Sequence, residues 1–561
     1  MFNHTFALEV AYSAVEESIR LGASYADARF ELSQAEKLTM RNGRLESVVQ
    51  LNERGLGIRV VVRGAWGFAA VSEPSRHDVV VAARRAVDMA RAAAVLLERP
   101  VRFVPASPVR STYRTAIRRD PLAVALEDKV ELLSKVDERL RATAGVVDSA
   151  ASVLAERRRK IYVNSDGAEI DQELVWAGGG CSAGVRNQAA PGFAVRGYPR
   201  VRRGGVSAGG WEFVQGLRLE DEAERVASEA KELLECRPCP AGRMPVLFSA
   251  QAAADLVAAT CGRFLESDRA VGWSRADGFS ASATGVRLGR AQVASPIVNV
   301  FADAMAEGGA GTFGFDDEGI EAHRVELITE GRHVGYLVGR EVAAVLGFSE
   351  ASGAMRGASW ADLPTVAPTN IGLSAGDAGD LESLVADMRS GLLIEGAQAI
   401  SLDERGDLFE GVGEFGWVIE DGRRIHRVSH PAYRGLTADL WMGCDAIGGA
   451  EGWAWFGVLD RTASGRSRPA ACVPQGRGAA PTRFRDLEVG PASGERIHHQ
   501  GQGHGSPPGV THANSGVDED QASLLSTARP KSASKPKAKT RKKAKNGPKT
   551  PRKRSGKKAR G

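Results

Sequence analysis

Three short groups of residues in the sequence have side chains of the kinds that bind metal ions or transfer protons. Two cysteines lie in Cys236-Arg-Pro-Cys239, two histidines in His426-Arg-Val-Ser-His430, and three acids in Asp316-Asp317-Glu318. Thiolate, imidazole and carboxylate groups are the usual ligands of zinc, and a carboxylate beside a zinc-bound water can take that water's proton. Hydrolysis at a metal centre is therefore one chemistry that these residue types could perform.

The spacing within the first two groups favours simpler roles. The two cysteines have no second ligand pair nearby, so two ordinary thiols in a linker compete with a metal or redox site. The two histidines are four residues apart, as on one face of a helix, but they follow the turn residues Asp421-Gly422 in an expected strand. There the rings would lie about two pleats apart, and we interpret them as solvated hairpin residues.

The elements that position these residues change in character after Cys236. Up to that point the periodicity predicts helices alternating with strands. The helices are expected at Phe6–Ile19, Ser75–Ala90, Leu122–Ala142 and Glu220–Leu234, and the strands at Ala26–Leu32, Lys37–Arg41, Leu45–Leu51, Gly57–Val62, Val146–Glu156 and Lys160–Val163. Beyond a proline-rich linker, short strands and glycine-rich turns predominate as far as Gly490, with helices expected at Ala250–Leu265, Gly339–Leu346 and Leu381–Ser390.

The charge of the chain is divided between an acidic body and a basic tail. Of 74 Lys and Arg residues, sixteen lie in Arg529–Gly561, which has no Asp or Glu, so residues 1–528 hold 58 basic against 69 acidic residues, a net −11. Residues 491–561 also have few apolar side chains, and we expect them to be disordered. The tail could bind nucleic acid or another polyanion by neutralising phosphates, or could be only a solubilising extension.

The sequence has no feature that directs it to a membrane or out of the cell. No run of 18 or more apolar residues is present, and Met1–Val10 lacks the charged and apolar pattern of a secretory signal. The six Cys residues are scattered without a dense spacing pattern. We therefore expect a cytoplasmic protein with free thiols and no membrane segment.

Four collinear groups of segments carry a family resemblance. They are Gly55–Ala69 (GLGIRVVVRGAWGFA); Gly311–Gly319 (GTFGFDDEG) with Leu327–Gly331 and Gly335–Leu337; Pro368–Ile371 with Ile394–Ser401 and Gly413–Gly422; and Pro474–Val489. Together they resemble the TldD/PmbA family of peptide-processing metalloproteases. The resemblance implies an α+β protein with an N-terminal α/β domain (residues 1–237), a larger, mostly antiparallel β-rich domain (residues 243–490) and the disordered basic tail (residues 491–561).

The resemblance also implies a way of working. Similar members of the family act on peptides in the cytoplasm, typically as a pair of related subunits. One subunit has a His-Glu-x-x-x-His helix and a later Cys that complete a zinc site, and the other lacks it. In this context we interpret Asp316, Asp317 and Glu318 as residues that shape a turn and hold a hydrogen-bond network, with paired acids for catalysis or for a cation as the alternative.

The positions that match the zinc motif cannot bind zinc. Aligned on the strand Val246–Ser249, the motif falls on Ala258-Ala259-Thr-Cys-Gly-Arg263, and a methyl group or a guanidinium offers no lone pair to a metal. The region that matches the later Cys reads Leu459–Gly465 and contains no Cys. We therefore expect no zinc and no other cofactor, and we predict an Arg263–Glu266 ion pair in its place.

Three hypotheses about function follow. In the leading one, the chain is a non-catalytic subunit that binds peptides by strand addition and pairs, as a hetero- or homodimer, with a TldD/PmbA-type homologue that bears zinc. In the second, the chain is an active metallopeptidase whose site is rebuilt from Cys261, Glu266 and a remote Cys or His. In the third, it is associated with nucleic acid or another polyanion through Arg529–Gly561.

Overall fold

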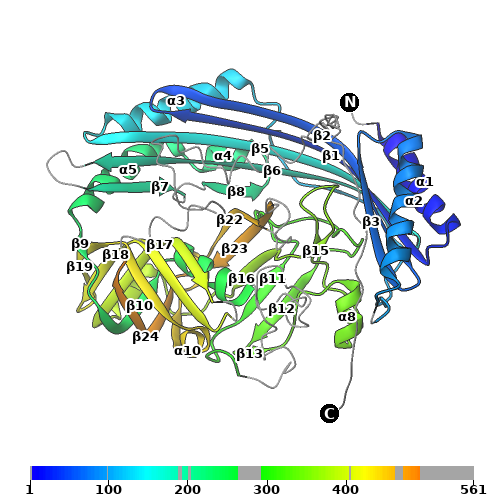
Figure 1. Ribbon diagram of the computed structural model, residues 1–561. Helices are drawn as coiled ribbons and strands as arrows, with labels where there is room; N and C mark the ends of the chain where they lie inside the picture. The colour runs from blue at the N-terminus through cyan, green and yellow to red at the C-terminus, as the bar shows by residue number, and fades with distance from the viewer. Residues whose placement is uncertain are drawn as a thin grey trace, which may run out of the picture. The chain divides into compact units, whose positions relative to one another are not determined.

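The computed structural model describes residues 3–97, 99–186, 192–199, 204–262, 292–403, 406–461 and 472–492 (Figure 1). Arg263, Glu266 and the basic tail, for which the sequence makes specific predictions, therefore lie outside the described residues. None of the helices in the described ranges is long and apolar enough to cross a membrane.

Four long antiparallel strands form the first sheet: β1 (Tyr25–Arg41), β2 (Arg44–Val62), β5 (Val146–Asn164) and β6 (Glu169–Arg186). With β3 (Ala65–Ser72) and β4 (Arg110–Arg114) the order is β3-β2-β1-β5-β6-β4, and β7 (Phe193–Tyr198) and β8 (Gly205–Ala208) also pair with β6. The predicted breaks within β1, β2 and β5 are wrong, because each strand is continuous. At Gly55 the glycine serves packing, since a Cβ there would lie 2.2 Å from the ring of Trp360.

The helices of this region cover one face of the sheet at its two ends. They are α1 (His4–Arg20), α2 (Arg76–Ala93), α3 (Leu126–Ala142), α4 (Trp211–Gly216) and α5 (Leu219–Glu235). Helices α1 and α2 pack with Phe30 of β1 in one apolar core, and α3 and α5 pack with Leu38 in another. Because side chains alternate along a strand, Phe30 and Leu38 point to the same face, and the helix pairs lie at opposite ends of the long strands (Figure 1).

The opposite face of the sheet carries buried charged side chains. Asp27, Arg29 and Glu31 alternate with the apolar residues of β1, and their cross-strand neighbours include Arg59 and Lys160. An alternation of this kind ordinarily indicates a strand with one solvated face. Here the charged face is buried, because residues 310–362 cover it and contact it, for example through Asp317 and Ser359.

The second region contains a closed ring of strands. They are β17 (Ser390–Leu402), β10 (Gly242–Phe248), β24 (Thr482–Pro491), β20 (Pro431–Leu436) and β18 (Leu408–Glu420), and β17 also pairs with β18, which closes the ring. Phe248, Tyr433 and Phe484 pack edge to face in its core, with ring centroids 5.0 and 5.7 Å apart from Phe248. Strands β19 (Arg423–Ser429), β9 (Arg237–Pro238) and β21 (Cys444–Ile447) extend this sheet.

A second sheet lies beside the ring in the order β13-β12-β11-β16-β23-β22. Its strands are β11 (Val300–Asp303), β12 (Arg324–Thr329), β13 (Arg332–His333), β16 (Asn370–Leu373), β22 (Ala454–Arg461) and β23 (Cys472–Ala479), and a separate pair consists of β14 (Met355–Arg356) and β15 (Thr365–Val366). The short helices are α6 (Ala250–Val257), α8 (Arg340–Leu346), α9 (Leu381–Ala386) and α10 (Thr437–Met442).

The structure confirms the predicted fold class. It is an α+β protein with an N-terminal region of helices and strands and a β-rich region after it, and most strand pairs of that region are antiparallel. Ser75, where the sequence places the start of a helix, is the N-cap of α2, and its side chain and that of Asp78 form a reciprocal capping box.

Candidate functional site

The turn Asp316-Asp317-Glu318 is one of the places that the sequence singles out. All three side chains are buried, and the turn lies between β11 and β12. The Asp316 carboxyl group accepts hydrogen bonds from the backbone N–H groups of Glu318 (2.8 Å), Ile320 (2.9 Å) and Met355 (3.0 Å). Asp316 therefore fixes the conformation of its own turn and joins it to β14.

Asp317 reaches the charged face of the N-terminal sheet. Its carboxylate lies 2.8 Å from Arg29 Nη1 and 3.1 Å from Lys160 Nζ, and it accepts a hydrogen bond of 2.6 Å from the Gly357 N–H. Burial alone raises the pKa of a carboxyl, but Arg29 and Lys160 hold the pKa of Asp317 well below its ordinary value. Asp317 is thus an ionised carboxylate that compensates two buried cations.

Glu318 completes the contact with the same face. One carboxylate oxygen accepts from the backbone N–H of Arg340 at 2.8 Å, and the other lies 3.4 Å from Arg59 Nη1. Arg59 in turn pairs with Asp27 at 2.8 Å. Burial and then the neighbouring Glu318 raise the pKa of the Asp316 carboxyl to about 8, against the effect of its backbone donors. The turn therefore combines an ionised acid, Asp317, with an acid that holds its proton strongly, Asp316.

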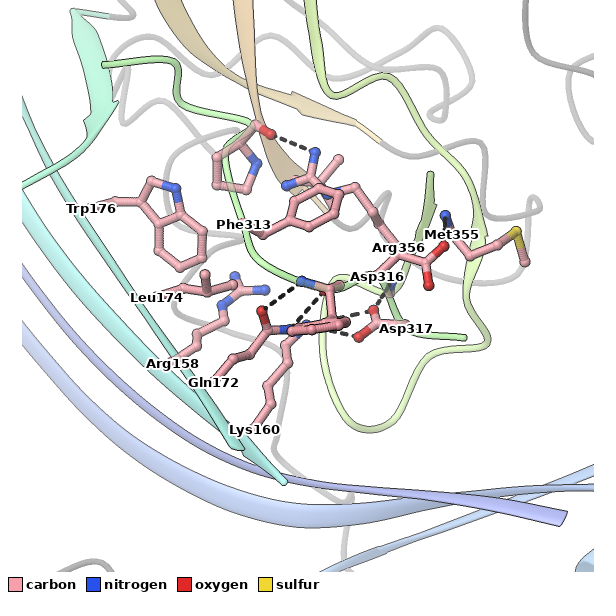
Figure 2. A pocket seen from close by; sticks show the side chains of 14 residues that line it. Arg158, Lys160, Gln172, Leu174, Trp176, Phe313, Asp316, Asp317, Met355 and Arg356 are labelled. Carbon is pink, nitrogen blue, oxygen red and sulfur yellow. Dashed lines mark hydrogen bonds and ion pairs between the residues drawn. The ribbon is translucent and has the colours of Figure 1, made fainter. Parts of the chain in front are cut away.

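A small cavity adjoins the turn (Figure 2). Its volume is about 20 Å³, room for about one water molecule, and its wall includes Arg158, Lys160 and Gln172 from the sheet. Arg356, also on the wall, donates to the carbonyl oxygens of Pro474 at 2.7 Å and Pro368 at 3.0 Å. A cavity of this size does not admit a peptide. The role of the acid turn is therefore structural: its ion pairs with Arg29, Arg59 and Lys160 hold the N-terminal sheet against the second region.

Sequence reasoning did not find the basic partners of this turn. The signal that could have indicated them is the alternation of Asp27, Arg29 and Glu31 along a strand, which places three charges on one face. Nothing in that pattern says that the face is buried.

The second place is the helix that matches the zinc motif. Helix α6 begins at Ala250, is capped by the side chain of Ser249, and is followed by one wide π-helical turn over Ala258–Gly262. Ala258 is buried, and Thr260 accepts a hydrogen bond of 2.9 Å from the Trp441 indole N–H while donating to the Leu256 carbonyl at 2.6 Å. The wide turn is thus packed in place by its own side chains.

A buried ion pair lies one turn before Ala258. Asp255, on α6, accepts from Arg477 Nη1 of β23 at 2.8 Å, and the two side chains are 4% and 14% exposed. Arg477 also lies 3.3 Å from the Gln475 side-chain oxygen. The pair fixes α6 against the sheet that contains β23.

The donors in this place do not fit a zinc ion. Ala258 and Ala259 have no lone pairs, and burial raises the pKa of the Cys261 thiol to about 12, so this sulfur stays protonated at neutral pH. Asp255 is already paired with a guanidinium. Over the residues that the structure describes, no three His, Cys, Asp or Glu side chains are grouped as metal ligands, and this range includes Cys236, Cys239, His426 and His430.

Comparison with known proteins agrees with the motifs quoted above. Three family models match the chain: PmbA/TldA metallopeptidase domain 1 over residues 26–94, the central domain over residues 119–237 and the C-terminal domain over residues 241–490. Together they cover more than half of the sequence. The chain belongs to the TldD/PmbA family.

Individual proteins also match this chain over most of their own length. A metalloprotease of Methanocaldococcus jannaschii is 24% identical over 442 residues, covering 77% of this chain and 91% of the relative. A metalloprotease of Methanothermobacter thermautotrophicus is 27% identical over 469 residues, covering 83% and 95%. The crystal structure of TldE from Thermococcus kodakarensis has the same fold, with a TM-score of 0.61, 18% identity and coverage of 85% of this chain and 99% of TldE.

Proposed function

We propose that the chain is a non-catalytic, peptide-binding subunit of the TldD/PmbA type that works with a zinc-bearing homologue in the cytoplasm. The observation that carries the proposal is the chemistry at the end of α6, where buried Ala258 and half-buried Ala259 replace a ligand and the general base. A hydrolytic zinc needs three protein ligands, an open position for water and a base for that water. None of the side chains described there supplies them.

The retained architecture supports a binding role. The acid turn and its basic partners connect the two regions by buried ion pairs, which hold the regions in a fixed relation to each other. The sheet of β11, β12, β13, β16, β22 and β23 ends on one side in β22, and such an edge strand is a place where an extended peptide can add as a further strand. A partner subunit with an intact motif would then cleave the peptide.

Two measurements on the purified full-length chain test the proposal. Alone, it should contain no stoichiometric zinc by elemental analysis and should not hydrolyse fluorogenic peptides. Mixed with a TldD/PmbA homologue that retains His-Glu-x-x-x-His, it should form a stable complex whose peptidase activity exceeds that of the homologue alone and is lost with a chelator. Chelator-sensitive hydrolysis by the chain alone, with bound zinc, would favour the rebuilt site and refute the proposal.

Nucleic-acid or polyanion association is a second candidate, carried by the sixteen basic residues of Arg529–Gly561. It concerns a different part of the chain and is compatible with the first proposal. Its test is the removal of that segment.

A further inference from the structure

The helix-bearing face of the long sheet has an open cavity between its two helix pairs. Leu32 and Gln34 of β1 lie between the residues packed by α1 and α2 and those packed by α3 and α5, and they point to the same face. The cavity has a volume of about 410 Å³, within the range of small-molecule and short-peptide sites. We call it the trough; it is lined by Leu32, Gln34, Asn52, Arg54, Glu73, Arg157, Arg159 and Glu173.

The floor of the trough recognises a ligand through side chains only. Strand β1 is hydrogen-bonded to β2 on one side and β5 on the other, and β5 is bonded to β6 as well. Their backbone donors and acceptors are therefore used within the sheet. Strand addition, the binding mode proposed for the other region, therefore cannot operate on β1 or β5.

Two arginines of the trough have N–H groups to offer. Arg54 pairs with Glu73 through one nitrogen, and both side chains are about half exposed, at 51% and 58%. Arg157 is 24% exposed and donates from Nη2 to Asp120 at 2.5 Å. Its Nε is buried and lies 3.8 Å from Glu173, so only its terminal nitrogens can meet a ligand. A guanidinium has five donors in a planar fork that fits a carboxylate. Arg54 and Arg157 can therefore each bind a further acceptor.

We infer that the trough is a binding site for an acidic segment of a peptide or protein. Guanidinium groups match its carboxylates, and Gln34 and Asn52 match its peptide groups. Glu73 and Glu173 disfavour ligands of denser negative charge, such as polyphosphates or nucleic acids. The inference is independent of the proposed function, because the trough lies on the face of the sheet opposite the acid turn.

The exposed Arg54–Glu73 ion pair of the trough allows a test in which two substitutions should have opposite effects. A fluorescein-labelled peptide Gly-Glu-Glu-Glu-Gly is titrated with the full-length chain at low salt, and fluorescence anisotropy gives Kd. Arg54→Gln should weaken binding about fivefold, because one exposed charge pair is lost. Glu73→Gln should tighten binding by a factor of about two to five, because Arg54 is released from its present partner.

Controls separate the trough from the basic tail and from general charge. Arg44→Gln, on an exposed arginine of the same strand, should leave Kd unchanged. A photo-crosslinking version of the peptide should label β2 and β5, not Arg529–Gly561. Unchanged Kd in both variants of the Arg54–Glu73 pair, labelling confined to the tail, or stronger competition by pyrophosphate than by unlabelled peptide would each overturn the inference.

Discussion

At the scale of single residues, Asp317 has the clearest energetic role. Its carboxylate compensates Arg29 and Lys160, all three being buried. Removing one partner of a buried ion pair leaves an uncompensated charge away from water, which typically costs about 3–5 kcal/mol. Asp317→Asn should therefore lower the denaturant midpoint of unfolding by a large margin. Asp486→Asn, which breaks a surface pair with Arg243 that is more than half exposed, should leave the midpoint unchanged.

The same carboxyl should make stability depend on acid. The pKa of Asp317 is lower in the folded chain than its ordinary value of 3.8, so its contribution is complete above that value and is lost as the pH falls below it. The unfolding midpoint of the wild type should fall more steeply below about pH 4 than that of Asp317→Asn. Parallel pH profiles for the two proteins would show that this carboxylate is not the group responsible.

The residue types alone predict that the motif positions at the end of α6 cannot bind a metal. They do not predict which side chains pack around these positions. Methyl groups at Ala258 and Ala259 exclude ligation whatever the fold. The Asp255–Arg477 pair joins residues 222 positions apart, and no local pattern connects them. The predicted Arg263–Glu266 pair lies outside the described residues and stays a prediction.

At the scale of elements, the sequence predicts the alternating faces of the N-terminal strands correctly, but it does not predict that these strands are continuous. Gly55 ordinarily indicates a turn, and the sequence before and after it reads as two strands. In the structure β2 runs through this glycine because Trp360, from a distant segment, packs flat against the strand. Likewise the alternation in β1 identifies two faces correctly, but burial of the charged face depends on the segment around Asp317, which local pattern cannot reveal.

Substitution of Gly55 tests that packing. In Gly55→Ala the new Cβ would lie 2.2–2.5 Å from three ring carbons of Trp360, so the ring or the strand must shift, at a cost of about 1–3 kcal/mol. We expect a lower unfolding temperature, with partial recovery when Trp360→Ala is added. Gly216→Ala is the matched control, because a Cβ there meets nothing within 4 Å. Equal effects of Gly55→Ala with and without Trp360 would contradict the packing account.

At the scale of the whole molecule, the regions are joined by charge as much as by apolar surface. Arg29, Arg158 and Gln172 of the long sheet bind carbonyl oxygens of Ser359, Ala358 and Phe315. With the ion pairs of Asp317 and Glu318 they join the sheet to the following region over a broad area. Buried polar contacts of this kind tolerate little relative movement, because any gap leaves charges without partners. In the proposed role as a non-catalytic subunit, such a junction would hold a fixed binding surface for the partner.

Charge also separates this body from the tail, and this leads to the last prediction. Residues 1–528 carry a net −11, whereas the full chain carries +5. A chain ending at residue 528 should therefore elute from a DNA or heparin column at low salt, while the full chain is retained. Its retention should fall steeply as salt increases, because each neutralised phosphate releases counterions. The unfolding midpoint should be the same for both chains if the tail adds nothing to the folded core. If the shortened chain were retained as strongly as the full chain, residues 1–528 and not the tail would bind the polyanion, despite their net negative charge, and the prediction would be wrong.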